Sequence, residues 1–117
     1  MPGFPSPADD YLAGPLDLNA HLIKHPAATF LMRATEDAML KAGIHPGDIL
    51  VVDRSLEPSH GRIVIASVEG SLTVKRLQIE QNRLMLLAEN ESYSSIRVDK
   101  DNGVEIWGVV TTVIHPV

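Results

Sequence analysis

Apolar and β-branched residues gather in six short stretches of this 117-residue chain, separated by polar segments rich in glycine and proline. Such stretches are typical of β-strands. The pattern predicts strands at residues 29–34, 49–53, 62–68, 71–79, 83–88 and 104–115. The last stretch contains the run Val104–Val113, which includes Trp107 and is almost all apolar. That pattern is expected of a core strand buried on both faces, or of a strand at a subunit interface.

Turn and helix signals lie between these stretches. Glu69-Gly70 separates two predicted strands and is typical of a two-residue hairpin turn. Asp17 is suited to cap a short helix from Leu18 to about Lys24, which Pro26 ends. One further helical turn is predicted between residues 34 and 43. The fold class is therefore predicted to be mainly β, with one or two short helices.

The first sixteen residues differ from the rest of the chain. They contain four prolines, each of which removes a backbone donor and restricts the residue before it (Pro2, Pro5, Pro7 and Pro15). A long helix is therefore excluded there. We expect an extended N-terminal arm over residues 1–16, followed by a β domain over residues 17–117.

Composition narrows the classes of function. Hydrophobic residues make up 44% of the chain and charged residues 21%, which allows a packed core. The net charge of −5 argues against a protein that binds nucleic acid directly. The absence of cysteine excludes disulfides and thiolate metal sites. The chain contains no membrane-length apolar run and no signal-peptide pattern, so a cytoplasmic location is compatible with it.

Five histidines are the candidate metal ligands (His21, His25, His45, His60 and His115). His21 and His25 are four residues apart on the predicted short helix, a spacing that could bind a metal. Because no carboxylate motif accompanies them, we interpret the two as solvated helix residues. No metal and no cofactor are predicted.

Lys75 is the candidate catalytic residue. In a strand, Thr73, Lys75 and Leu77 would share one face. One interpretation is a lysine at a sheet edge whose apolar stem reaches to water. The other is a desolvated lysine with a lowered pKa, able to act as general base for a serine in a Ser–Lys dyad.

Four segments, in order, resemble the self-cleaving family of LexA, the phage repressors and UmuD. They are Ala-Thr-Glu-Asp-Ala-Met at 34–39, Pro-Gly-Asp-Ile-Leu-Val-Val-Asp at 46–53, Thr-Val-Lys-Arg-Leu at 73–77 and Ile-Trp-Gly-Val-Val at 106–110. The resemblance implies curved antiparallel sheets of the LexA/UmuD C-terminal type. It also implies that Lys75 is the general base and that position 38 is the nucleophile.

Two residues of the first segment depart from the family pattern. Ala38 stands where the family has its serine, and Glu36 stands where glycine is common. Loss of the nucleophile costs about a millionfold in subtilisin, so we expect no self-cleavage here. Ala38 is either an engineered change or a natural loss, and the sequence leaves both open. The serines of the β domain are interpreted as turn or surface hydroxyls (Ser55, Ser59, Ser67, Ser71, Ser92, Ser94 and Ser95).

The front of the chain resembles the processed form of UmuD, in the segments 3–8 and 10–11. In that family the chain cuts itself just before this glycine, helped by the RecA filament. The shortened dimer then joins UmuC, a Y-family polymerase, in error-prone translesion synthesis during the SOS response. Gly3 is thus the expected cleavage-site remnant. A homodimer, a UmuC-like partner and a bacterial cytoplasmic location follow from the same resemblance.

Two alternatives remain. The chain could be an active serine–lysine peptidase that uses another hydroxyl. It could also be the dimerisation domain of a LexA-like repressor, although a repressor would begin with a helix-turn-helix rather than with the UmuD-type segment at Gly3.

Overall fold

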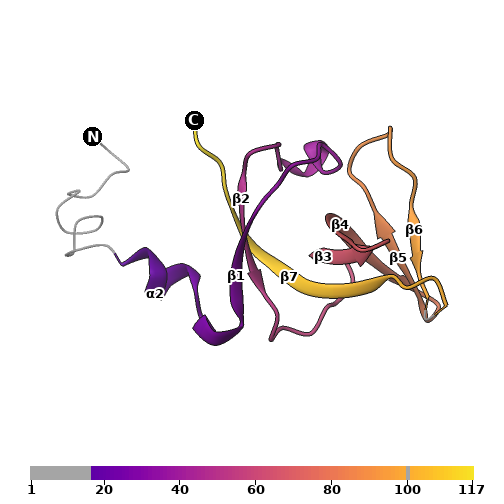
Figure 1. The fold of residues 1–117 in the computed structure, drawn as a ribbon, viewed down its shortest axis with the longest axis horizontal. Coiled ribbons are helices and arrows are strands. Elements are labelled where there is room, and N and C mark those ends of the chain that lie inside the picture. The colour runs from indigo at the N-terminus through magenta and orange to yellow at the C-terminus, as the bar shows by residue number, and fades with distance from the viewer. Residues whose placement is uncertain (1–16, 100) are drawn as a thin grey trace, which may run out of the picture.

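The computed structural model describes residues 17–99 and 101–117, which form a seven-stranded sheet (Figure 1). The strands are β1 (Thr29–Arg33), β2 (Ile49–Asp53), β3 (Ile63–Val68), β4 (Ser71–Glu80), β5 (Arg83–Leu87), β6 (Ile96–Val98) and β7 (Glu105–Ile114). Their order across the sheet is β1-β2-β7-β3-β4-β5-β6, and every neighbouring pair is antiparallel. The predicted mainly β fold with curved antiparallel strands is confirmed. The predicted arm, with Gly3, lies outside the described residues.

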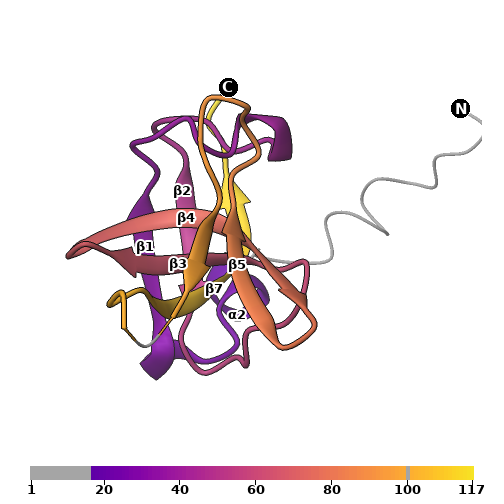
Figure 2. The same ribbon diagram turned by 90° about the vertical axis from the view of Figure 1, so that its right-hand side faces the viewer.

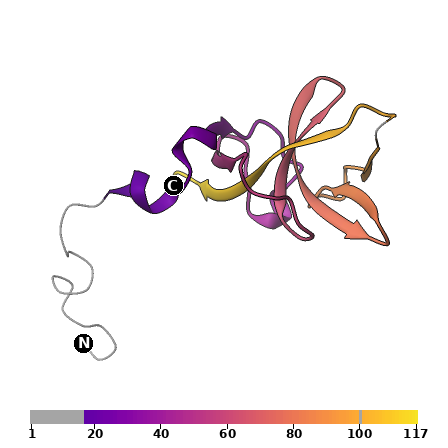
Figure 3. The same cartoon turned by 90° about the horizontal axis from the view of Figure 1, so that it is seen from below.

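The helices of the described chain are short. The α-helix α2 (Leu18–Leu22) projects away from the sheet (Figures 1 and 3). Its predicted cap is confirmed, because the Asp17 side chain accepts a hydrogen bond from the Ala20 amide at 3.2 Å. The helix ends before the predicted Lys24, since the backbone of Ile23 is already extended. Two 3₁₀ turns follow, η1 (Pro26–Ala28) and η2 (Leu40–Ala42). No helix in these residues is long and apolar enough to cross a membrane.

The sheet is strongly curled, and β7 runs through its middle (Figure 1). The register of β7 shifts against β2 between Val51 and Val52, and against β3 between Ile65 and Ala66. Such β-bulges bend a strand and increase its twist. The curl separates the core into two clusters, one that includes Met39 and Leu50 and one that includes Leu77 and Leu86.

Two of the hairpin turns have the same backbone geometry. Glu69 and Gly70 have φ values of 52° and 81°, as the predicted two-residue turn requires. Gln81 and Asn82 between β4 and β5 also have positive φ, at 51° and 63°. The short strand β6 was not predicted, because its three residues are too few to show a periodic pattern.

Gly108 in β7 occupies a position with no room for a side chain. A Cβ at this position would lie 2.7 Å from Cγ1 of Val52, which is fully buried. We expect Gly108→Ala to lower the free energy of unfolding by about 1–2 kcal/mol, because added volume forces a packed core to shift. Urea denaturation measures this loss. The control is Glu105→Ala at an exposed position of the same strand. An equal effect of both variants would contradict the tight packing.

Candidate active site

Lys75 lies in β4, with β3 on one side and β5 on the other. The residue is only 3% exposed. The interpretation as an edge lysine that reaches to water is therefore wrong, and the desolvated lysine is the one found. Burial is the largest influence on its side chain and lowers the pKa of Lys75, while the nearby Glu36 carboxylate opposes this shift.

A short chain of polar contacts holds the Lys75 amine. Its Nζ donates to Thr73 Oγ1 at 2.8 Å, and that hydroxyl donates to Glu36 Oε2 at 3.3 Å. Nζ lies 3.8 Å from the same carboxylate oxygen and 5.3 Å from the ring centre of Tyr93. The amine is thus positioned by a hydroxyl, a carboxylate and an aromatic face, on a strand whose backbone is paired on both sides.

Ala38 lies in the segment between β1 and η2, and its side chain is fully buried. It belongs to the same core cluster as Met39, Ile44 and Leu50. Its carbonyl accepts a hydrogen bond from the Glu89 amide at 2.8 Å. Position 38 is therefore held firmly against the loop between β5 and β6.

The neighbouring Asp37 is bound to the same loop. Tyr93 donates its hydroxyl to Asp37 Oδ1 at 2.7 Å, and Asn90 Nδ2 donates to the Asp37 carbonyl at 2.8 Å. The hydrogen bond to Asp37 is the main reason that the pKa of Tyr93 is raised. Figure 2 shows this loop, the η2 turn and the C-terminus at one end of the molecule.

These contacts bring the segment at 34–39 and the lysine strand together. Glu36 pairs with Lys75, and Tyr93 contacts both Asp37 and Lys75. A small pocket lies between residues 34–36 and 72–74. The Lys75 amine can bind or release a proton, whereas the Ala38 methyl group has neither a proton to give nor a lone pair with which to attack.

Sequence reasoning placed Thr73 on the same strand face as Lys75, because residues two apart share one face, but it identified no hydrogen-bond partner of the amine. Tyr93 and Asn90 lie in an irregular loop, where the local pattern carries no signal. The hydroxyl of Ser55, one of the alternative nucleophiles, donates to Asp53 Oδ1 at 2.6 Å.

The histidines make contacts that the local spacing does not suggest. His25 Nδ1 lies 2.6 Å from Oδ2 of the buried Asp53, rather than being only solvated. The Ser55 hydroxyl, followed by His25, lowers the pKa of Asp53 to about 2. His45, Asp48 and His115 also come together, although His115 is distant from the other two in sequence.

Comparison with known proteins places this chain in a family. The Peptidase S24-like family model matches residues 2–111. Protein SamA of Salmonella typhimurium is 49% identical over 113 residues, covering 97% of this chain and 78% of SamA. Protein MucA of Escherichia coli is 46% identical over 118 residues, covering 98% of this chain and 80% of MucA. The LexA repressor of Shewanella denitrificans is 40% identical over 97 residues, which are 83% of this chain and 47% of the repressor. The chain therefore belongs to the Peptidase S24-like family, as one of its UmuD-like members.

Proposed function

We propose that this chain is the accessory subunit of an error-prone translesion DNA polymerase in the SOS response. In this role it acts by binding and not by cutting itself. The observation that carries the proposal is a buried Lys75 paired with Glu36 of the segment that contains the buried Ala38, in a UmuD-like chain. Lys75 is the inherited general base, Ala38 the lost nucleophile, and Gly3 the remnant of the cleavage site.

A second copy of the chain is the first partner that we propose, through the closing strand β7. The residues of β7 that pair with β3 are Glu105 to Val109. From Val109 to Ile114, β7 pairs with β2, so over Val110 to Ile114 the edge of β7 that faces away from β2 has no partner strand among the described residues. Strand edges without a neighbour are prone to pair with another chain, and Ile114 adds an apolar side chain that is 41% exposed. The N-terminal arm is the alternative contact between the copies or with the polymerase.

The second partner is a UmuC-like Y-family polymerase, in the cytoplasm of a bacterium. The RecA filament would act on an uncleaved form. The net charge of −5 favours contact with DNA through the polymerase rather than directly.

Co-purification with a UmuC-type polymerase tests the proposal. We expect a dimer by light scattering and a complex with a dissociation constant of about 1 µM or tighter, a range suited to a specific assembly. Ile114→Glu, which places a charge on the proposed dimer strand, should shift the mass towards the monomer, whereas Glu105→Gln on the same strand should not. Absence of a complex at about 10 µM, where processed UmuD binds the same polymerase, would contradict the proposed function.

A further inference from the structure

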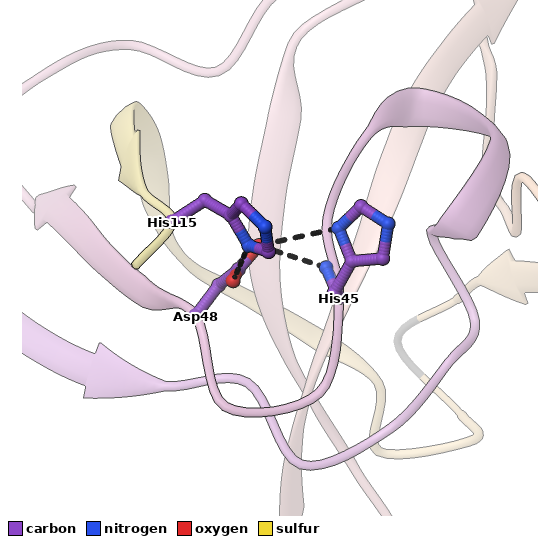
Figure 4. A group of neighbouring side chains, drawn as sticks. All are labelled: His45, Asp48 and His115. Atoms are coloured by element: carbon purple, nitrogen blue, oxygen red, sulfur yellow. Dashed lines mark hydrogen bonds and ion pairs between the residues drawn. The ribbon is translucent and has the colours of Figure 1, made fainter. Parts of the chain in front are cut away.

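A buried carboxylate lies between two imidazoles at the end of the molecule that carries the C-terminus (Figure 4). The Asp48 side chain is 1% exposed, and those of His45 and His115 are 49% and 50% exposed. Both histidines direct Nδ1 towards this carboxylate, at 3.7 Å for His45 and 2.6 Å for His115. The two rings lie 4.8 Å apart between centres.

Asp48 is held in place before any ligand arrives. Its Oδ2 accepts a hydrogen bond from the His45 amide at 2.8 Å, and its own amide donates to the His45 carbonyl at 3.0 Å. Its carbonyl accepts from the Ala34 amide at 2.8 Å. A carboxylate held by such hydrogen bonds is suited to coordinate a metal, because these contacts fix the direction of its oxygen atoms.

We propose that His45, Asp48 and His115 form a binding site for a divalent transition metal such as Zn²⁺. Imidazole with one carboxylate suits Zn²⁺, Ni²⁺ or Cu²⁺, whereas Mg²⁺ and Ca²⁺ require more oxygen ligands. Zinc lies about 2.1 Å from such ligands, which places tetrahedral ligand atoms about 3.4 Å apart. The three ligand atoms here lie within 4.8 Å of one another. Zn²⁺ binding would therefore require the two half-exposed rings to rotate towards each other.

The donor set of two imidazole nitrogens and one carboxylate oxygen matches the ligands that Zn²⁺ takes in proteins. Solvent exposure of both rings leaves an entry path and a coordination position for water. Bound metal would link the loop at His45, just after η2, to the segment that follows β7.

Isothermal titration of the tag-free chain with Zn²⁺ tests the proposal. We expect one ion per chain, with the ¹H–¹⁵N signals of the His45 and His115 rings shifting in the unmodified protein. His45→Gln and His115→Gln should each weaken Zn²⁺ binding by at least about tenfold, because even loss of an outer-shell partner costs 10–100-fold. Both positions are half-exposed, and circular dichroism confirms that each variant is folded.

His25→Gln is the matched control. His25 makes a similar 2.6 Å contact with a buried aspartate, Asp53, but the described residues bring no second histidine ligand into a group there. This variant should bind Zn²⁺ as the unmodified chain does. Either of two results overturns the proposal. The first is no Zn²⁺ binding at concentrations up to about 1 mM, because a specific site would have a lower dissociation constant than that. The second is Zn²⁺ binding that is lost in His25→Gln and kept in both His45→Gln and His115→Gln.

Discussion

Ala38→Ser is expected to restore self-cleavage, with a rate about a millionfold above that of the present chain, by analogy with loss of the serine in subtilisin. The substitution supplies a hydroxyl oxygen, whose lone pair can attack, in the segment that contacts the lysine strand. Neutral Lys75 would take the proton of that hydroxyl. The measurement uses a UmuD-like segment fused ahead of Gly3. Mass spectrometry then detects the cut just before Gly3, with and without a RecA filament.

Two further variants and the unmodified chain separate the roles within this site. Adding Lys75→Met to Ala38→Ser should abolish cleavage, because the general base is removed. Adding Thr73→Val to Ala38→Ser removes the hydroxyl that accepts from the Lys75 amine and should change the cleavage rate little, because that hydroxyl donates its own proton to Glu36 and not to the amine. Cleavage by the unmodified Ala38 chain would contradict the proposed inactivation and support the alternative of another hydroxyl.

The effect of Glu36 on the cleavage rate can be measured in the same experiment. Its carboxylate lies 3.8 Å from the Lys75 amine and favours the charged form, which cannot act as a base. Glu36→Gly, which introduces the residue common in the family, should therefore speed cleavage by Ala38→Ser. A change of one pKa unit makes the neutral amine about tenfold more abundant. A slower double variant would show instead that Glu36 is needed to position the loop.

Most strands of this fold could be predicted because their signal is local. The predicted strand at residues 49–53 matches β2, since a continuous apolar run bounded by a Pro-Gly-Asp turn is sufficient to define it. Glu69-Gly70 also fixes its hairpin by the conformation of two residues. The curl of the sheet depends instead on bulges of β7 against two different strands, so the LexA/UmuD resemblance was needed to anticipate it.

The site illustrates the limit of local patterns more clearly. A strand segment with one lysine is compatible with an edge or with the middle of a sheet. Lys75 is buried because β3 and β5 flank its strand and because Glu36 and Tyr93, from two other segments, lie near its amine. In the same way, His115 lies close to His45 and Asp48 because β7 leads the chain to that end of the molecule. The spacing of these residues in the sequence does not predict this proximity.

Lys75→Met is expected to stabilise the folded chain by about 1 kcal/mol at neutral pH, because burying an ammonium group costs more than a half-exposed carboxylate returns. Methionine fills a similar volume without the cost of burying an ammonium group. Glu36 is 43% exposed at its side chain and remains hydrated when the lysine is lost. Urea denaturation measures the change. In the control, Lys41→Met removes an exposed lysine paired with Glu91 at 2.6 Å, which should cost at most about 1 kcal/mol.

The pH dependence identifies the cause of this stabilisation. Because the pKa of Lys75 is lowered on folding, the unfolded chain binds more protons, and the stability of the present chain rises as the pH approaches the ordinary value of 10.5. The raised pKa of Tyr93 acts in the opposite direction above pH 10, so both proteins are compared at each pH. The advantage of Lys75→Met should therefore shrink as the pH rises. If the stability difference between Lys75→Met and the present chain stays constant from neutral pH to pH 10.5, the stabilisation comes from better packing of methionine and not from removal of the buried charge.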